Sequence, residues 1–526
     1  MTSILKYLNR ALLVLLLAAF AACSDNEGGN ESNGNGDDGN TETPADGDTY
    51  GYIKDTNGNP VEGVVVSDGY SCTVTDAEGR YALTRNADAG FVFYSLPSAY
   101  KVRVDKTYKL PRFFARLQAG TARYDFTLEA LAAPEKRFDL ICIGDPQINE
   151  ASHAVRFKEE AGREIREYAA SAGVPCYGIT LGDHVNNKWT LFTNMVVALQ
   201  PEQTGVPVFA TIGNHDHEFP TADEKAARAK YESYFGPVDY SFNRGDVHVV
   251  SMDNVIHNCK ASADYEGGFT AAQYEWLKQD LSFVPKDKMV ILCVHIPFRG
   301  GWGTNSAHAD ADKYYDEVLD LLSQYEYAAI MSAHTHSNIN YIHRKNGKEI
   351  FEHVTGTTCG AWWRSTVCTE GTPIGFGLYR IDGNLMEEWA YRSVRHDEQF
   401  QIRLYRASDT FVGGAKYRFK QTGADQIVAN IWNWDPSWTV NVYENDVLSG
   451  QMTRNSDIDA WTVAYHIGLL NNTDSYRKSS DHMFHYTLKN PAAAVRVEAI
   501  DRFGNKYEQT VFTDPAEHPG DFHADF

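Results

Sequence analysis

The fold of this chain is decided by the stretch Val206–His217, which reads VPVFATIGNHDH. A short apolar run that ends in a turn glycine is typical of a buried β-strand. Here the apolar residues stop at Gly213, and four polar residues follow at once: Asn214, His215, Asp216 and His217. The stretch therefore predicts a strand that delivers polar side chains to one edge of a sheet.

Four other apolar runs in the same part of the chain end in the same way. They are Phe138–Gly144 before Asp145-Pro146-Gln147, Tyr177–Gly182 before Asp183-His184, Met289–Val294 before His295, and Ala328–Ala333 before His334-Thr335-His336. Any one of these polar residues alone would be read as a helix cap, a turn former or an ordinary histidine. Ligands of open α/β sheets bind beyond the carboxyl ends of the strands, and Asp, Asn, Gln and His can all ligate metals. Five such strand ends in order therefore predict a metal site.

Helical stretches alternate with these strands between residues 136 and 397, namely Ala154–Ala170, Ala271–Leu281 and Asp312–Tyr325. Such alternation predicts an α/β layered domain. Residues 49–132 and 398–517 instead contain short apolar runs separated by turn signals such as Asn57-Gly58. We therefore expect an N-terminal β-sandwich domain and a C-terminal β-domain on either side of the α/β domain.

The composition excludes several classes of protein. The chain has 526 residues, of which 43% are hydrophobic and 22% charged, so wholesale disorder is excluded. Its formal net charge of -22 argues against a nucleic-acid polymer as partner, because such binding needs a basic surface. An anionic substrate is still allowed, because bound cations can reverse the local field. Eight cysteines are too few for a disulfide scaffold, and their pairing is left open.

Residues 1–23 predict an export signal. Lys6 and Arg10 precede the apolar run Ala11–Ala22, which is too short to span a bilayer. Cys23 follows this run, an arrangement that resembles a bacterial lipoprotein signal in which Cys23 is lipidated, although Phe20 replaces the usual leucine. The alternative is an ordinary secretory signal with an incidental cysteine.

Residues 24–48 are acidic and rich in Gly and Asn, which predicts a flexible tether. Ser24–Glu27 resembles the acidic surface-export signal of some outer-membrane lipoproteins, and a spacer facing the periplasm is the alternative. We therefore expect a cell-envelope protein, an outer-membrane lipoprotein held to the membrane by its lipid, either periplasmic or surface-exposed.

In order along the chain, the five polar blocks resemble the motifs of the calcineurin-like metallophosphoesterase family. The family pattern is Asp-x-His, Gly-Asp, Gly-Asn-His-Asp or -Glu, a lone His, and Gly-His-x-His. Here it reads Gly144-Asp145-Pro146-Gln147, Gly182-Asp183, Gly213-Asn214-His215-Asp216, His295, and Ala333-His334-Thr335-His336. The resemblance covers about residues 136–395, and the flanking domains look like those of bacterial members with three domains. It implies a calcineurin-like four-layer β-sandwich core that holds two divalent metal ions.

The resemblance also implies a role for each residue. Asp183 would bridge the two metal ions. Asp145, Gln147 and His336 would complete the first metal site, and Asn214, His295 and His334 the second. His215 matches a residue that faces the substrate without binding metal, and Asp216 matches the residue that orients the imidazole of His215.

Gln147 departs from the family pattern, where histidine is usual. An amide oxygen favours harder ions, so manganese is the favoured metal, with iron, zinc or magnesium possible. The alternative is that Gln147 does not bind and that the first metal is held weakly. Ala333 in place of glycine is a minor change of backbone freedom.

Residues beside the ligand blocks are candidates for substrate binding. Arg299, Trp302, Trp362, Trp363 and Arg364 follow ligand-bearing blocks, and His184 and His217 adjoin candidate ligands. Packing, a solvated loop or a supporting role behind the ligands would explain each of them equally well. Trp432, Trp434 and Trp438 in the C-terminal domain could bind sugars, but a packed interface is favoured for them.

We expect a dinuclear hydrolase of phosphate esters. Two metal ions would clamp the phosphate and acidify a water, and the bridging hydroxide would attack phosphorus in line. His215 would protonate the leaving oxygen. A small or glycan-linked phosphodiester or pyrophosphate is the favoured substrate. The alternatives are a phosphomonoesterase or nucleotidase of the same fold, and a surface carbohydrate-binding lipoprotein with weak catalysis.

Overall fold

The computed structural model describes residues 47–299, 313–408, 423, 425–472 and 478–510. Cys23, the predicted signal and most of the predicted tether lie outside these ranges, as does Trp302. None of the helices within the described ranges combines the length and hydrophobicity needed to cross a membrane.

The N-terminal region contains two small sheets, as its turn-rich sequence predicts. One has the order β4-β1-β7 and the other the order β3-β2-β5-β6. The strands are β1 (Thr49–Asp55), β2 (Val65–Ser67), β3 (Cys72–Val74), β4 (Arg80–Leu83), β5 (Phe91–Tyr94), β6 (Phe114–Arg116) and β7 (Phe126–Leu128).

Two larger sheets form the central region. The five-stranded sheet has the order β10-β9-β8-β19-β20 and the six-stranded sheet the order β11-β12-β15-β16-β18-β17. Their strands are β8 (Arg137–Ile143), β9 (Cys176–Leu181), β10 (Val208–Thr211), β11 (Tyr240–Arg244), β12 (Val247–Ser251), β15 (Met289–Cys293), β16 (Tyr327–Ser332), β17 (Ile339–Lys345), β18 (Lys348–Val354), β19 (Gly375–Asp382) and β20 (Leu385–Ser393). A separate ribbon joins β13 (Val255–His257) to β14 (Tyr265–Gly267).

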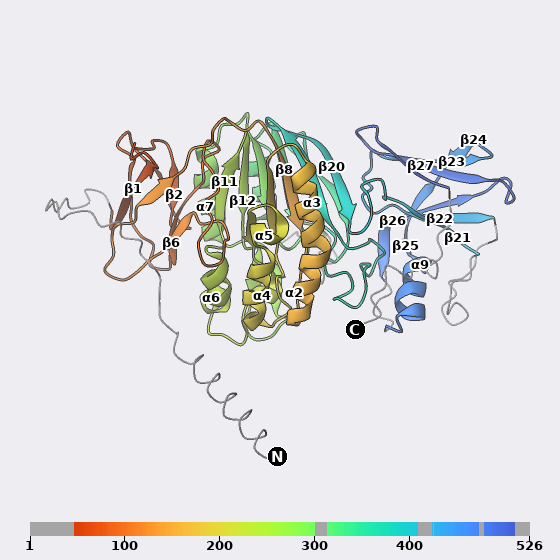
Figure 1. Cartoon of the computed structure of the whole chain (residues 1–526), viewed down its shortest axis with the longest axis horizontal. Helices are drawn as coiled ribbons and strands as arrows, with labels where there is room; N and C mark the ends of the chain where they lie inside the picture. The colour runs from red at the N-terminus through yellow and green to blue at the C-terminus, as the bar shows by residue number, and fades with distance from the viewer. Residues whose placement is uncertain (1–46, 300–312, 409–422, 424, 473–477, 511–526) are drawn as a thin grey trace, which may run out of the picture. The chain divides into compact units, whose positions relative to one another are not determined.

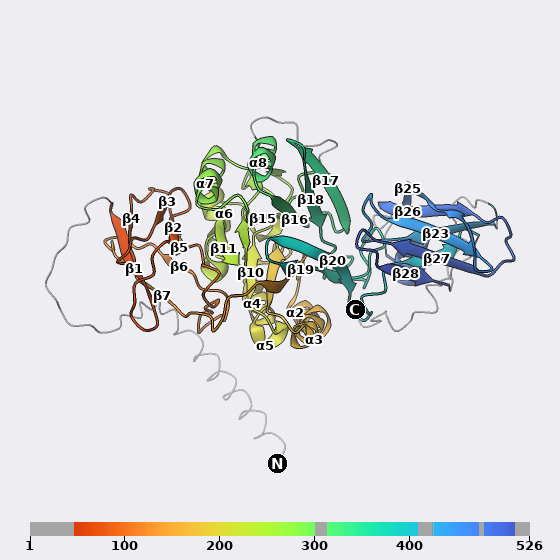
Figure 2. The same ribbon diagram turned by 90° about the horizontal axis from the view of Figure 1, so that it is seen from above.

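Helices cover the outer faces of both sheets and complete four layers, so the predicted fold class is confirmed (Figures 1 and 2). The alternation of side chains along β8 explains the layering, because residues two apart on a strand share a face. Leu140 and Cys142 lie in the core between the sheets, whereas Ile141 and Ile143 pack with the helices on the outer face. Cys293 joins the same inner core, so the expected packing role of both cysteines is confirmed. All seven described cysteines are unpaired.

The helices of this region are α2 (Ala151–Phe157), α3 (Arg163–Ser171), α4 (Phe192–Ala198), α5 (Pro201–Thr204), α6 (Glu224–Phe235), α7 (Ala271–Ser282) and α8 (Tyr315–Leu322), with 3₁₀ turns η2 (Trp189–Leu191) and η3 (Asn214–Asp216). The single helix predicted over 154–170 is interrupted by a π-helical turn, η1 (Lys158–Gly162). Glu160 in this turn and Glu164 beyond it are buried, and both bind Arg395. The turn thus lets both carboxylates meet one arginine.

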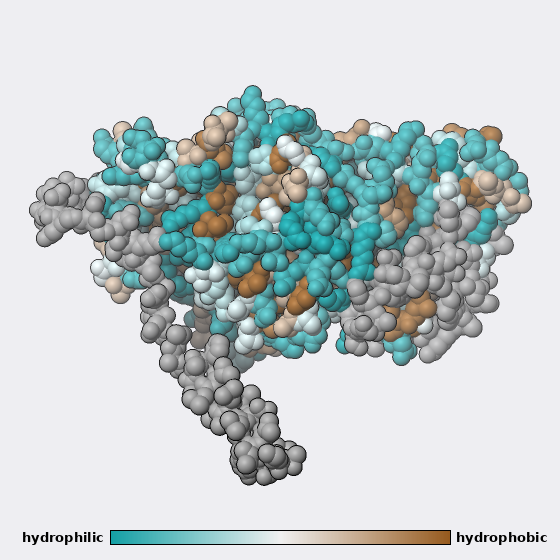
Figure 3. Space-filling model, viewed as in Figure 1, coloured by the Kyte–Doolittle hydropathy of each residue, from teal (hydrophilic) through white to brown (hydrophobic). Residues whose placement is uncertain are grey.

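The C-terminal region is a second pair of sheets, with orders β21-β22-β26-β25 and β24-β23-β27-β28. The strands are β21 (Arg403–Arg406), β22 (Gln426–Asn430), β23 (Thr439–Glu444), β24 (Val447–Gln451), β25 (Thr453–Ile458), β26 (Ser479–Thr487), β27 (Val495–Ile500) and β28 (Lys506–Gln509). A short helix, α9 (Ala460–Val463), runs into a π-helical turn, η5 (Ala464–Leu469). On the face shown in Figure 3, the hydrophobic residues among the described atoms lie in small separate patches, which fits the acidic composition.

Candidate metal centre

The carboxyl ends of five strands bring the predicted ligands together. β8, β9 and β10 are parallel in one sheet, and β15 and β16 are parallel in the other. Asp183 beyond β9 clusters with His295 and His334 beyond β15 and β16, so the two sets of strands end at the same edge of the core. Five of the residues just beyond these ends have a positive φ, which is uncommon for side chains other than glycine. They are Asp145 (37°), Gln147 (36°), Asp183 (52°), His334 (65°) and His336 (55°). Left-handed backbone of this kind is a strain that clusters at functional sites.

The predicted second metal site is a tight buried cluster. Asp183, His295 and His334 each offer a ligand atom, and these atoms lie within 4.8 Å of one another. His295 Nδ1 donates a hydrogen bond to the carbonyl of Leu181 at 2.7 Å, so Nε2 is the nitrogen that points into the cluster. This Nε2 lies 2.9 Å from Asn214 Oδ1 and 3.3 Å from Asp183 Oδ1. The four residues expected to hold one ion therefore converge.

The atoms that face one another in this cluster can all bind a cation. Although burial lowers the pKa of His295, the negative charge of Asp183 raises it to about 9. Burial raises the pKa of Asp183, but the imidazoles of His295 and His215 hold it below its usual value. The Asp183 carboxylate therefore favours positive charge in this cluster, which a bound cation would supply.

The predicted first metal site has buried atoms whose bonding is incomplete. Asp145 Oδ1, Gln147 Oε1 and His336 Nδ1 are buried and have no hydrogen-bond partner among the described residues. Such atoms cost free energy unless something satisfies them. Gln147 Nε2 donates to Asp183 Oδ2 at 3.3 Å, and His336 Nε2 lies 3.7 Å from Asp145 Oδ1. The residues of the predicted first metal site therefore fit a cation of their own, on the other side of Asp183 from the cluster described above.

The remaining ionisable groups of the site favour ligand forms. Burial lowers the pKa of His334 well below its ordinary value, and the charge of His295 is the next largest cause. Burial followed by the charge of Lys478 lowers the pKa of His336 to about 3. Neutral imidazole is the form that binds metal. Burial also raises the pKa of Asp145 well above its usual range, a cost that a bound cation would offset.

His215 differs from the candidate ligands in exposure. Its side chain is 23% exposed, whereas that of Asp183 is buried. Its backbone N–H donates to Asp183 Oδ1 at 2.8 Å, and its Nδ1 donates to Asn187 Oδ1 at 2.8 Å. Nε2, which lies 4.0 Å from Asp183 Oδ2, is therefore held toward the open side of the centre. This placement fits the predicted substrate-facing role.

The prediction that Asp216 orients His215 is wrong. Asp216 Oδ2 accepts hydrogen bonds from His184 Nδ1 at 2.9 Å and from the N–H of Gly213 at 3.0 Å. Asp216 Oδ1 accepts from the N–H of His184 at 2.8 Å. The 3₁₀ turn η3 thus sends these neighbouring side chains in different directions, and Asn187 holds the imidazole instead. Asp216 fastens the turn after β9 to the turn after β10.

The assignment of His184 and His217 to substrate binding is also wrong, because both are buried. His184 bonds to Thr180 Oγ1 at 2.7 Å and packs against Phe235. His217 Nδ1 donates to the carbonyl of Gly213 at 2.9 Å, and its Nε2 pairs with Asp253 at 3.1 Å. The two histidines support the ligand-bearing turns from behind.

The structure brings one of the other predicted substrate residues to the centre. The Trp362 ring packs on His336 with centroids 4.9 Å apart. Trp363 is buried, and its Nε1 donates to the carbonyl of Pro146 at 2.9 Å, so it packs beneath the site. Arg299 and Arg364 are exposed, and Arg299 lies over the Tyr341 ring at 5.6 Å. Substrate binding by these two arginines stays a prediction.

Two residues near the centre were missed by the sequence reasoning. Asn187 lies four positions after Asp183, and this closeness to a predicted ligand is the only feature of the sequence that could have identified it. Tyr265 OH lies 3.4 Å from His334 Nε2, but Tyr265 comes from the β13–β14 ribbon, which carries no motif.

Three family models match consecutive parts of the chain. Residues 48–131 match the N terminal of Calcineurin-like phosphoesterase, and residues 125–338 match Calcineurin-like phosphoesterase itself. Residues 352–507 match the C terminal of Calcineurin-like phosphoesterase. Together the matches reach from the first described strand to the last.

Curated relatives and solved structures each resemble part of the chain. Purple acid phosphatase 23 of Arabidopsis thaliana is 26% identical over 181 residues, 31% of this chain and 36% of the relative. Purple acid phosphatase 18 of the same plant is 25% identical over 182 residues, 32% of this chain and 38% of the relative. The chain thus spans little more than a third of these relatives. A dimetal phosphatase from Danio rerio is 12% identical at a TM-score of 0.35, over 50% of this chain and 99% of that one. Purple acid phosphatase PPD1 from yellow lupin is 15% identical at a TM-score of 0.35, over 50% of this chain and 53% of that one.

Proposed function

We propose that this chain, which belongs to the calcineurin-like phosphoesterase family, is a dinuclear metal-dependent hydrolase of phosphate esters. The family models cover its N-terminal, central and C-terminal parts, so the predicted family and its three-domain arrangement are confirmed. The prediction of a phosphoesterase of the hydrolase class is confirmed at the level of the family. The role of each residue and the substrate are our proposals.

The donor set around Asp183 carries the proposal. The two carboxylate oxygens of Asp183 face different neighbours: Oδ1 faces His295 at 3.3 Å, and Oδ2 faces Gln147 at 3.3 Å. Asp183 is thereby placed to serve two ions at once. Asp145, Gln147 and His336 would hold the first ion, and Asn214, His295 and His334 the second. Manganese remains the favoured metal because Gln147 offers oxygen, with iron, zinc or magnesium as alternatives.

His215 and Asn187 supply the proton chemistry in this proposal. Two bound metal ions would provide positive charge to hold the phosphate and acidify an attacking water. His215 is near enough to Asp183 to meet the substrate, and the hydrogen bond to Asn187 keeps one proton on Nδ1. The imidazolium form then carries its second proton on Nε2, and this Nε2–H is the proton given to the leaving oxygen, which leaves a neutral ring.

The favoured substrate is a small or glycan-linked phosphodiester or pyrophosphate. A phosphomonoester or nucleotide is the alternative for the same site. The carbohydrate-binding alternative loses its support, because Trp432 and Trp438 are buried and Trp434 packs on Phe484 at 5.8 Å. We also propose, from residues 1–48 alone, an outer-membrane lipoprotein anchored through Cys23 and facing the periplasm or the cell surface. Cys23→Ser should release the protein from membranes on cell fractionation, and unchanged membrane association would refute the anchor.

Hydrolysis assays test the proposed activity. The purified protein with added manganese is expected to release p-nitrophenol from bis(p-nitrophenyl) phosphate, which has one diester phosphate. It should do so faster than from p-nitrophenyl phosphate if the diester preference is right. A faster reaction with the monoester would replace the favoured substrate class by the alternative, and no reaction with any phosphate ester would refute the proposed function.

A further inference from the structure

One segment joins the candidate metal centre to the C-terminal domain. Residues 355–374, here called the crossover segment, connect β18 of one central sheet to β19 of the other. On the side of the centre, the N–H of Thr358 donates to the carbonyl of Gly144 at 2.9 Å, directly before Asp145. On the other side, Arg403 Nη1 donates to the carbonyl of Gly371 at 2.7 Å. The C-terminal domain therefore packs on the segment that borders the metal centre.

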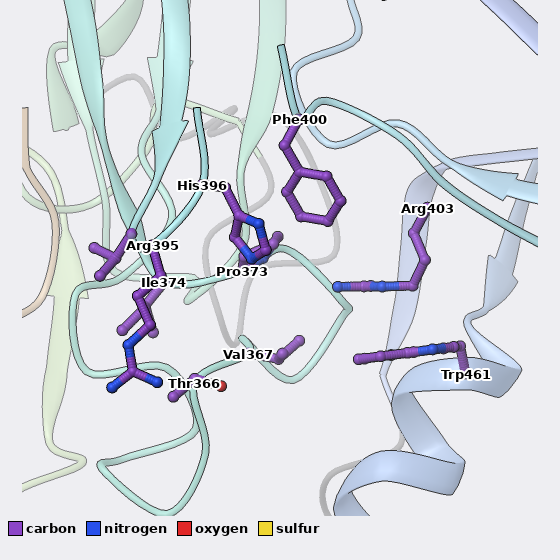
Figure 4. A pocket seen from close by; sticks show the side chains of 10 residues that line it. Thr366, Val367, Pro373, Ile374, Arg395, His396, Phe400, Arg403 and Trp461 are labelled. Atoms are coloured by element: carbon purple, nitrogen blue, oxygen red, sulfur yellow. The ribbon is translucent and has the colours of Figure 1, made fainter. Parts of the chain in front are cut away.

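Further contacts fix this junction. Ser365 Oγ lies 2.7 Å from His466 Nε2, and Thr366 Oγ1 lies 2.9 Å from Tyr465 OH. Figure 4 shows a pocket at the junction, where the guanidinium of Arg403 lies over the Trp461 ring at 3.7 Å. Candidate metal ligands do not line this pocket. The contacts around it hold the C-terminal domain in a set position against the crossover segment.

The same packing carries a lysine to the metal centre. Lys478 directly precedes β26 of the C-terminal domain, and its Nζ lies 5.7 Å from the centroid of the Trp362 ring. Trp362 in turn packs on His336, with centroids 4.9 Å apart. One aromatic side chain therefore separates the ammonium group from a candidate ligand of the first metal site. The effect of Lys478 on the pKa of His336 agrees with this closeness.

We propose that Lys478 and Trp362 form a subsite for a second phosphate group of the substrate, next to the phosphate that is hydrolysed. This assignment rests on the proposed function and narrows its substrate class to pyrophosphate-linked compounds. An ammonium group binds phosphate as a point charge, and Trp362 offers a flat apolar surface for what the second phosphate carries.

The surroundings of Lys478 support an anionic partner. The ammonium group of Lys478 would attract an anion to this side of the centre, although the chain as a whole has a charge of -22. Glu370 attracts Lys478, and the carboxylate of Glu370 also accepts from the N–H of Thr372 at 2.8 Å and lies 3.4 Å from His482 Nε2. Trp362 has a φ of 51°, a left-handed conformation that is costly for an aromatic residue. The backbone thus holds the ring at a strained position between the lysine and the metal centre.

Comparing two probes with manganese in excess tests the subsite. Bis(p-nitrophenyl) phosphate has one phosphate, whereas UDP-glucose has two joined by a pyrophosphate bond. UDP-glucose is measured as a substrate and as an inhibitor of the first reaction. The assays run at about pH 7, because burial lowers the pKa of Lys478 to about 8 and the amine must be charged. The variants are Lys478→Met, Lys478→Arg and Lys506→Met, the last changing an exposed lysine of the same domain.

Lys478→Met should raise the KM or inhibition constant for UDP-glucose about 10- to 100-fold, the usual loss when a hydrogen bond to a charged group is removed. Its kcat/KM for bis(p-nitrophenyl) phosphate should change less than about threefold, and Lys478→Arg should keep most UDP-glucose binding. Lys506→Met should match the wild type. Equal losses for both probes, no loss for either, or a wild-type protein that hydrolyses the diester but ignores UDP-glucose would overturn the subsite alone. Failure of the wild type to hydrolyse any phosphate ester would overturn the proposed function as well.

Discussion

Removing the side chain of Asn187 should slow turnover and leave the metal centre filled. Asn187 Oδ1 accepts the hydrogen bond of His215 Nδ1 at 2.8 Å, and no candidate ligand depends on this contact. A typical intramolecular hydrogen bond contributes about 0.5–1.5 kcal/mol net. If His215 must be held to deliver its proton, Asn187→Ala should lower kcat about 2- to 12-fold, since about 1.4 kcal/mol is a factor of ten. His215→Ala should cost more, about 10²–10⁴-fold, because the proton donor itself is lost.

The assay is bis(p-nitrophenyl) phosphate hydrolysis, with metal content measured on the same samples. Asn187→Asp keeps the acceptor oxygen and should retain most of the activity. Asn187 also has a left-handed backbone, with a φ of 54°, so its replacement carries a conformational cost. Asn346→Ala is a matched control, because Asn346 is exposed and has a φ of 51°. An Asn187→Ala variant with wild-type kcat, or one that loses metal in proportion to activity, would refute the positioning role.

Three further variants test other parts of the site and the fold. Asp183→Asn should remove both metal ions and nearly all turnover with the fold retained, and two tightly bound ions by metal analysis would rule out bridging. Gln147→His should tighten the first site and shift the metal preference toward zinc when activity is titrated with each metal. If the variant and the wild type have the same midpoint for manganese and the same midpoint for zinc, Gln147 does not contact the metal. Burial, followed by the charge of Asp253, raises the pKa of Asp239 to about 7. Between about pH 4 and pH 7 the folded state therefore binds more protons than the unfolded state, and the free energy of unfolding falls as the pH rises. Asp239→Asn should therefore raise the free energy of unfolding at pH 8 by up to about 4 kcal/mol, less at pH 5, and urea titrations with an equal change at both pH values would contradict this.

The strand ends were predictable because their signals are local. Each apolar run and the polar residues after it lie within about ten positions, and a parallel sheet places such ends at one edge. The residues proposed as ligands accordingly meet, from Asp145 just beyond β8 to His336 beyond β16. The family pattern supplied the expected role of each block, which periodicity alone does not give.

The partners of Asp216 and His215 were not predictable in the same way. The two residues are adjacent in sequence, and the turn η3 decides which neighbour each side chain meets. Asp216 turns to His184, and Asn187 takes the place at His215. The roles of His184 and His217 were also not predictable, because a histidine next to a ligand can either support the ligand-bearing turn or contact the substrate. Their burial in the folded chain indicates the supporting role.

The position of Lys478 beside the metal centre could not be predicted from the sequence around it. It lies far from Trp362 in sequence and in a different domain, and packing of the C-terminal domain on the crossover segment brings them together. The π-helical turn in the helix predicted over 154–170 has a similar origin, because Arg395 from beyond β20 meets both buried glutamates. Contacts of this kind depend on the tertiary fold.

Metal-dependent hydrolysis tests the central claim most directly. The protein is stripped with a chelator, and bis(p-nitrophenyl) phosphate hydrolysis is followed while manganese is added back, with bound metal quantified on the same samples. The account predicts that the stripped protein is inactive and that activity returns as about two ions bind to each chain. Undiminished hydrolysis by protein shown to contain no metal, or full activity with Asp183→Asn, would contradict it.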